Sequence, residues 1–103
     1  MPAFLTKRQV FEWIQSGEKT IELRSGKSLD GENITFISGR GQTVKARILR
    51  KQEGKLEDLL NAATFRKIVP TAKSLDEALA FVRAIYPLSN DTFTTYEFRL
   101  EKE

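Results

Sequence analysis

Apolar and polar residues alternate in four short segments of the chain, and this period of two predicts β-strands. The segments are Lys19–Arg24, Asn33–Ser38, residues 42 to about 50, and Thr92–Leu100. Between the second and third segments, the sequence Gly39-Arg40-Gly41 is typical of a tight hairpin. The first three strands are therefore expected to be consecutive in the chain, with the fourth at its C-terminal end.

A helical pattern is strongest in the segment Leu75–Tyr86, where apolar residues recur every three or four positions. Ser74 and Glu77 match a capping box at its start, because the serine hydroxyl can accept from the backbone three residues later. A shorter helix is expected over Leu56–Asn61, after a polar connection at 51–55.

The N-terminal segment predicts a further helix, from Thr6 as its N-cap to about Gln15, with Gly17 as its C-terminal stop. Strands joined by hairpins, with helices before and after them, indicate an α+β fold. Antiparallel strands of this number and length often curl into a small barrel, which removes exposed edges. We expect a compact, partly open β-barrel, mainly antiparallel, with two or three helices packed around it.

The composition narrows the chemistry that the chain can perform. Its 103 residues suit one domain spanning 1–103, and it contains neither cysteine nor histidine. Thiol nucleophiles, imidazole bases and zinc sites with nitrogen or sulfur ligands are therefore excluded. We expect no metal site and no cofactor. No apolar run approaches the roughly 18 residues of a membrane span, and residues 1–5 do not resemble a signal peptide. The absence of cysteine also fits a cytoplasmic protein.

Positive charge gathers between Arg40 and Lys55, although the net charge of the chain is only +3. This segment has one acidic residue, Glu53, and six basic ones: Arg40, Lys45, Arg47, Arg50, Lys51 and Lys55. A basic lobe suits a polyanionic partner, and Arg40, Lys45, Arg47 and Arg50 are the predicted nucleic-acid contacts. The alternative is a solvated strand face whose charges prevent aggregation. Aromatic residues for base stacking are few: Phe36 and Tyr96 are candidates, and burial in the core is the commoner role of both.

The segment Gly17–Arg24 concentrates the hydrogen-bonding side chains of the sequence. Strand alternation puts Thr20, Glu22 and Arg24 on one face and the apolar pair Ile21 and Leu23 on the other. Lys19 lies at the start of the strand, two residues after Gly17. The apolar pair is expected to face a core, and the polar row is expected to face a site.

Gly17–Arg24 matches the pattern Gly-x-Lys-x-x-Glu-x-Arg, and on this motif the chain resembles the ASCH (activating signal cointegrator homology) domain family. This is a β-barrel family similar to the PUA RNA-binding domains. The resemblance covers nearly the whole chain and includes the segments 31–34, 44–48 and 85–87. It implies a cleft beside the barrel that binds RNA, a nucleotide or a nucleoside. In that cleft Gly17 makes the turn, and Lys19, Glu22 and Arg24 face the ligand.

These residue types suit nucleic acid. Lys19 can pair with a phosphate, Arg24 can grip phosphate oxygens or stack on a base, and Glu22 can accept from an exocyclic amine. Single-stranded or looped RNA is favoured, because unpaired bases can enter a concave site. The alternative is an internal salt bridge, in which Glu22 only holds Arg24 in place.

The resemblance also allows catalysis. One branch of small bacterial ASCH proteins hydrolyses acetylcytidine with a lysine, a threonine and a glutamate. Lys19 matches the lysine of that branch. Its threonine position is occupied by Glu22, and the nearest threonine is Thr20. The position of its glutamate falls near Thr71, which is not acidic. An amidohydrolase would use Lys19 with Glu22 or Thr20, and a ribonuclease would use Lys19, Arg24 and Tyr96. Since Glu22 has no hydroxyl to attack a carbonyl, we expect binding in preference to catalysis.

Overall fold

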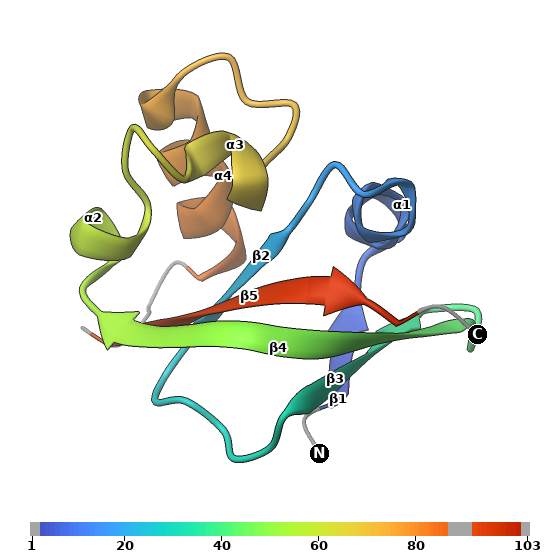
Figure 1. The fold of residues 1–103 in the computed structure, drawn as a ribbon. Coiled ribbons are helices and arrows are strands. Elements are labelled where there is room, and N and C mark those ends of the chain that lie inside the picture. The colour runs from blue at the N-terminus through green and yellow to red at the C-terminus, as the bar shows by residue number, and fades with distance from the viewer. Residues whose placement is uncertain (1–2, 87–91, 102–103) are drawn as a thin grey trace.

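The structure is a computed structural model that describes residues 3–86 and 92–101. In this part of the chain, five strands form one sheet in the order β1-β3-β4-β5-β2, accompanied by four helices (Figure 1). The strands are β1 (Ala3–Thr6), β2 (Ile21–Ser25), β3 (Asn33–Ser38), β4 (Thr43–Gly54) and β5 (Phe93–Leu100). The helices are α1 (Arg8–Ser16), α2 (Leu56–Leu59), α3 (Phe65–Ile68) and α4 (Leu75–Ile85).

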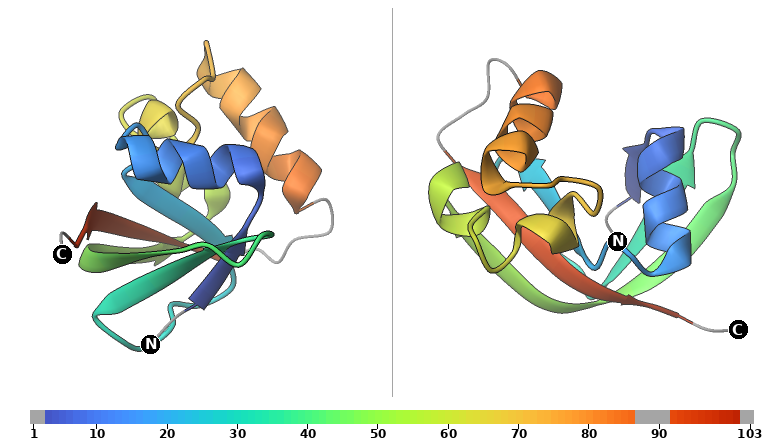
Figure 2. Two further views of the ribbon diagram at one scale, coloured as in Figure 1. Left: turned by 90° about the vertical axis from the view of Figure 1, so that its right-hand side faces the viewer. Right: turned by 90° about the horizontal axis from the view of Figure 1, so that it is seen from above.

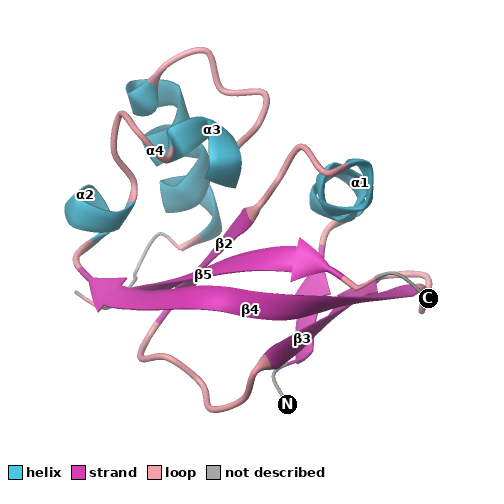
Figure 3. Ribbon diagram, in the orientation of Figure 1, coloured by secondary structure: helices cyan, strands magenta, loops and turns pink. Residues whose placement is uncertain are grey.

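The sheet is curled, and β1 and β2 are its two edges. All pairs are antiparallel except β1 with β3, which run parallel. Figure 2 shows β4 and β5 as a long curved ribbon, with α1 near one end and α2 to α4 near the other. Figure 3 shows the same arrangement by element type, with α2, α3 and α4 near one end of β4 and β5 and α1 near the other. The expected α+β fold with a partly open barrel is confirmed.

Two separate apolar clusters hold this sheet and its helices together. One, the barrel core, joins the sheet to α1, and the other, the helix core, joins it to α2, α3 and α4. The two clusters lie on opposite faces of β5, because Tyr96 and Phe98 belong to the first and Phe93 to the second. The buried members of the barrel core are Phe4, Phe11, Ile14, Ile34, Phe36, Ala46, Tyr96 and Phe98. The buried members of the helix core are Trp13, Ile21, Leu23, Leu56, Leu59, Leu60, Ile68, Val69, Ala72, Ala78, Val82 and Phe93.

The predicted cap of the first helix is wrong. Thr6 is the last residue of β1, and its hydroxyl donates to the Ile37 carbonyl at 3.2 Å instead of capping α1. The helix begins at Arg8, and Lys7 at its N-cap makes no side-chain capping bond. Local pattern could not detect β1, since its four residues become a strand only by pairing with the distant β3. The predicted stop is confirmed, because Gly17 ends α1 with a φ of 84°.

The other elements lie close to their predicted positions. Strand β4 is longer than expected, because residues 51–54 continue it beyond an irregularity in pairing between Ile48 and Arg50; the polar connection predicted there is wrong. The capping box of α4 is confirmed, since the Ser74 hydroxyl accepts from the Glu77 amide at 3.2 Å. The helix ends at Ile85, one residue before the predicted end, and the stop expected at Pro87 lies outside the described residues.

Candidate functional site

Strand β2 presents a polar face and an apolar face, as the sequence predicts. Ile21 and Leu23 are buried in the helix core. Glu22 is the register partner of Tyr96, and neighbours on paired strands point to the same side, so Glu22 and Arg24 face the barrel core. Backbone hydrogen bonds hold the two residues before the strand against α1 and α3. The Lys19 amide donates to the Trp13 carbonyl at 3.1 Å and the Thr20 amide to the Lys67 carbonyl at 3.1 Å.

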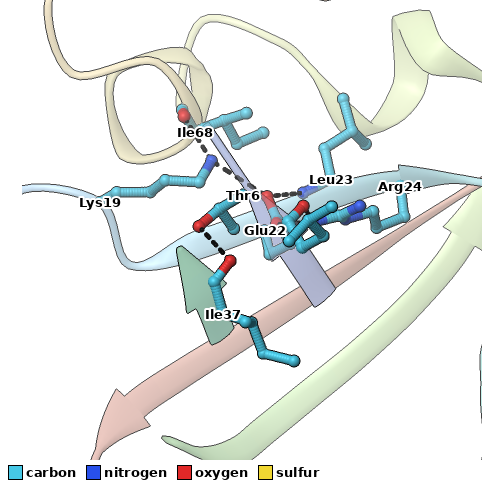
Figure 4. A network of polar contacts seen from close by, with 8 residues as sticks. Thr6, Lys19, Glu22, Leu23, Arg24, Ile37 and Ile68 are labelled. Atoms are coloured by element: carbon cyan, nitrogen blue, oxygen red, sulfur yellow. Dashed lines mark hydrogen bonds and ion pairs between the residues drawn. The ribbon is translucent and has the colours of Figure 1, made fainter. Parts of the chain in front are cut away.

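Three charged side chains of this segment form one buried network (Figure 4). The Lys19 ammonium donates to the Ile68 carbonyl at 2.6 Å and lies 3.4 Å from Glu22 Oε1. The same oxygen accepts from the Leu23 amide at 3.2 Å. Glu22 Oε2 accepts from Arg24 Nε at 3.2 Å and Nη2 at 3.0 Å. Both carboxylate oxygens are thus engaged, and Glu22 holds the two cations in fixed positions.

Arg24 also connects the two edges of the open barrel. Its Nη2 donates to the Leu5 carbonyl of β1 at 3.1 Å, and its guanidinium carbon lies 4.3 Å from the centre of the Phe4 ring. A guanidinium at this distance from an aromatic face is held by a cation–π interaction. The side chain remains 27% exposed, whereas those of Lys19 and Glu22 are 5% and 7% exposed. Arg24 is therefore the member of the network that solvent reaches.

Burial changes the proton affinity of two groups here. Loss of solvent lowers the pKa of Lys19 from its ordinary value near 10.5, and the nearby Glu22 carboxylate only partly offsets this effect. Burial raises the pKa of the Tyr86 phenol, whose hydroxyl lies beside Arg24 at the end of α4. The site therefore combines an amine that gives up its proton more readily than usual with a phenol that keeps its own.

A cavity of about 150 Å³ opens at this network. It lies between α1 and α4, next to the end of β1 and the middle of β2. Its walls are mostly apolar, and Lys19, Glu22, Arg24 and Tyr86 supply polar atoms. The remaining lining residues are Leu5, Thr6, Lys7, Val10, Trp13, Leu23, Ile68, Val69, Phe81, Val82 and Ile85. An apolar pocket with a few convergent polar groups is the usual form of a small-ligand site.

The structure brings some of the predicted site residues together and separates others. Lys19, Glu22 and Arg24 line the cavity, whereas Thr20 is not among its lining residues. Gly17 is exposed in the turn that ends α1. Tyr96 is buried in the barrel core, where its hydroxyl accepts from the Leu29 amide at 3.0 Å. Phe36, the other predicted stacking candidate, is also fully buried in that core. The phenol at the cavity is that of Tyr86, directly after the end of α4.

Sequence reasoning missed the aromatic side of the cavity. Trp13, Phe81 and Tyr86 line it, and the rings of Trp13 and Phe81 lie 5.7 Å apart. In the sequence, helical periodicity places Phe81 and Tyr86 within an ordinary amphipathic helix. Only the packing of α4 opposite α1 shows that part of this apolar face borders a cavity.

The predicted nucleic-acid contacts are divided between two regions. Arg40 lines a second hollow beside the cavity, near the start of α1. Lys45 and Arg47 are exposed on β4 and alternate with Val44 and Ala46 of the barrel core, so they face away from it. Arg50 is exposed beyond the pairing irregularity. The basic segment is therefore not one continuous lining of the cavity.

Within residues 3–86 and 92–101, no three acidic side chains gather as they would to hold a metal ion. None of the helices in this part of the chain has the length and apolar character needed to cross a membrane.

No protein-family model and no curated protein sequence matches the chain, but solved structures share its fold. The hypothetical protein PH0355 matches with a TM-score of 0.76 at 16% identity, over 96% of this chain and 97% of that protein. ASCH from Zymomonas mobilis matches with a TM-score of 0.69 at 18% identity. The chain has an ASCH-like fold. The match covers 94% of this chain and 65% of the Zymomonas protein. Protein EF3133 from Enterococcus faecalis V583, of the DUF984 family, has the same fold, with a TM-score of 0.68 at 12% identity over 98% of this chain and 76% of that protein.

In this ASCH-like fold, the motif predicted from the sequence lies where the curled sheet is open. Lys19, Glu22 and Arg24 occupy the gap between the β1 and β2 edges, and α1 and α4 form the walls above it. The motif therefore has two roles in the structure: it joins the barrel edges, and it supplies the polar floor of the cavity.

Proposed function

We propose that this ASCH-like chain binds an unpaired base of RNA, or the base of a free nucleoside or nucleotide, in the cavity between α1 and α4. One observation carries the proposal: a charged network that is largely buried borders an open cavity. Burying a lysine and a glutamate is costly unless they are paired, and hydrophobic replacements often stabilise a fold as well as such a pair does. A binding role accounts for charges at this position.

The size of the cavity supports a single flat ring as the ligand. An engineered protein cavity of about 150 Å³ accepts benzene, and the cavity described above has about the same volume. Pockets for drug-sized molecules start at about 300 Å³. A base therefore fits inside, while a sugar and phosphate would extend beyond the mouth.

The free hydrogen-bonding capacity favours a ligand edge rich in acceptors. Both Glu22 oxygens are engaged by Lys19, Leu23 and Arg24, so Glu22 positions donors and does not read an exocyclic amine. An ammonium has three N–H donors, and within the described residues two of those of Lys19 are directed at Ile68 and Glu22. The third N–H, with Arg24 and the Tyr86 hydroxyl, suits the keto oxygens and ring nitrogens of a base.

The aromatic lining gives a flat ring an apolar surface to pack against. Trp13 lies in α1, Phe81 in α4 and Tyr86 directly after α4. Stacking of a base on an aromatic side chain contributes roughly 1–3 kcal/mol and tolerates any base. Selectivity would then depend on the polar floor.

A second candidate is hydrolysis of an acyl amide on a bound nucleoside. It is favoured by the lowered pKa of Lys19, because an unprotonated amine can take a proton from the attacking water. The water oxygen would bond to the acyl carbon, and the proton taken up by Lys19 would pass to the amide nitrogen as the C–N bond breaks. The products would be a carboxylic acid and the free amine. Thr20 lies outside the cavity lining, so it does not supply the hydroxyl that the related hydrolytic branch uses. The threonine that does line the cavity, Thr6, donates its hydroxyl to the Ile37 carbonyl.

NMR spectroscopy can test the proposal directly, because Trp13 is the single tryptophan of the chain and borders the cavity. Its indole N–H resonance would be followed while the four ribonucleosides, acetylcytidine and a short single-stranded RNA are titrated. We expect saturable shifts with at least one ligand. The Lys19→Met variant is expected to weaken binding about tenfold, as for loss of one hydrogen bond from a charged donor.

The matched control is Lys45→Met, which removes the same charge from the outward face of β4 and should bind like the wild type. If no nucleoside and no RNA causes a saturable shift, the proposed function is wrong. Chromatography of the acetylcytidine samples separates the two candidates. Release of cytidine by the wild type, but not by Lys19→Met, would establish hydrolysis.

A further inference from the structure

We infer that the ligand carries a phosphate group, which lies in a second hollow next to the base cavity. This inference rests on the proposed function and narrows its ligand to a nucleotide unit, either free or within an RNA strand. The second hollow has a volume of about 260 Å³ and lies between α1 and the hairpin that joins β3 to β4. Its lining residues are Thr6, Lys7, Arg8, Phe11, Glu12, Gln15, Ser38, Gly39, Arg40 and Gln42.

The two hollows are neighbours that share a wall. Thr6 and Lys7, at the end of β1 and the start of α1, line both of them. A ligand whose base enters the first hollow would therefore pass over these two residues to reach the second. In a nucleotide, the sugar joins base and phosphate in this way.

The charge of the second hollow suits an anion. Lys7, Arg8 and Arg40 bring three positive charges, and Glu12 is the one acidic residue in the lining. Arg8 and Glu12 form an ion pair at 3.3 Å, but their side chains are 77% and 62% exposed. Exposed pairs of this kind contribute little to stability, so a phosphate can replace Glu12 as the partner of Arg8 at small cost. Arginine is well suited to this, since its planar fork can grip two phosphate oxygens.

Hydrogen bonds hold the backbone near these cationic side chains in place without a ligand. The Ser38 hydroxyl is buried beneath the hairpin and accepts from the amides of Arg40 and Gln42, at 3.3 and 3.2 Å. Gly41 allows the turn with a φ of 83°. On the shared wall, the Thr6 hydroxyl is bound to the Ile37 carbonyl. A preorganised site loses less entropy when a ligand binds.

Charge alone does not single out this hollow. Lys45, Arg47 and Arg99 form an equally basic group on the outward sheet face, where Arg47 and Arg99 are direct register partners. That face belongs to neither of the two hollows described above. What distinguishes the second hollow is the combination of cations with a concave surface that is continuous with the base cavity. The outward group therefore serves as a control with the same number of charges.

The test compares each ribonucleoside with its 5′- and 3′-monophosphates and with a dinucleotide, by NMR titration of the full chain at low salt. We expect at least one phosphorylated form to bind about tenfold tighter than its nucleoside, as for one charge-assisted hydrogen bond. The double variant Arg8→Gln/Arg40→Gln, which leaves the lining of the base cavity unchanged, should lose this advantage and still bind the nucleoside. The control Arg47→Gln/Arg99→Gln should retain it. All four substitutions are at exposed positions, and thermal unfolding verifies that both variants fold.

Equal affinity for nucleosides and nucleotides would overturn this inference and leave the proposed function intact. Equal loss of the phosphate advantage in both double variants would also overturn it, because the effect would then come from overall charge. If no nucleoside or nucleotide binds, both the inference and the proposed function fail. A dinucleotide that binds at least as tightly as the monophosphates would assign the phosphate to an RNA strand, and a preference for monophosphates would assign it to a free nucleotide.

Discussion

Replacing Glu22 by glutamine tests whether its carboxylate holds Lys19 and Arg24 in place. The side chain is 7% exposed and accepts four N–H contacts, from the Leu23 amide, the Lys19 ammonium and two nitrogens of Arg24. Glutamine has nearly the same shape but only one acceptor oxygen. If that oxygen keeps Arg24, the amide nitrogen faces Lys19 and the Leu23 N–H, so that donors point at donors.

The expected cost follows from these contacts. Removing one partner of a buried ion pair destabilises a protein by about 3–5 kcal/mol, because the remaining charge is buried without compensation. Lys19 can reduce this cost by releasing its proton, so the lower value is expected at neutral pH, about 3 kcal/mol. In a domain of this size each kcal/mol lowers the melting temperature by roughly 4–8 °C, so a fall of roughly 12 °C or more is expected.

The assay is urea denaturation followed by circular dichroism, with thermal melting as a second measurement. The control is Glu12→Gln, which removes a carboxylate from the exposed pair with Arg8 and should cost less than about 1 kcal/mol. The double variant Lys19→Met/Glu22→Gln should recover part of the loss, because neither buried charge remains. The structural role of Glu22 would be refuted if Glu22→Gln lowered the free energy of unfolding by less than about 1 kcal/mol. It would also be refuted if the loss in the double variant equalled the sum of the losses in the two single variants.

Two further predictions concern the same motif. Because the pKa of Lys19 is lowered on folding, the unfolded chain binds more protons between that lowered value and about 10.5, and stability should rise with pH across this window. The Lys19→Met variant should lack this part of the rise in stability. The denaturation series is kept below pH 10, because the raised pKa of Tyr86 makes stability fall with pH above that value. Parallel pH profiles for the two proteins would contradict the burial of a charged amine. The second substitution, Gly17→Ala, should lower stability by about 1 kcal/mol, because a side chain at φ 84° is strained even though no atom lies within 4 Å of the added Cβ; unchanged chemical denaturation would show that the turn can relax.

Much of the fold was predictable because its signals are local. The alternation in β2 and β3, the stop at Gly17 and the cap at Ser74 depend on residues close together in the chain, and the structure confirms them. Strand β1 and the extension of β4 were not predictable in this way. Their hydrogen-bond partners lie on β3 and β5, far away in the sequence, and the local pattern of the segments does not predict this pairing.

The sequence by itself determined which side chains of β2 share a face and which chemistry is excluded. Strand geometry sets the first, since Glu22 and Arg24 differ by two positions, and the absence of cysteine and histidine sets the second. Only the tertiary structure decided what that face does. Pairing of β2 with β5 directs Glu22 and Arg24 into the barrel, contact with β1 makes Arg24 a bridge, and packing of α4 against α1 leaves a cavity. Burial and solvent exposure depend on contacts between distant segments, so no local pattern could have distinguished the buried carboxylate of Glu22 from the partly exposed cation of Arg24.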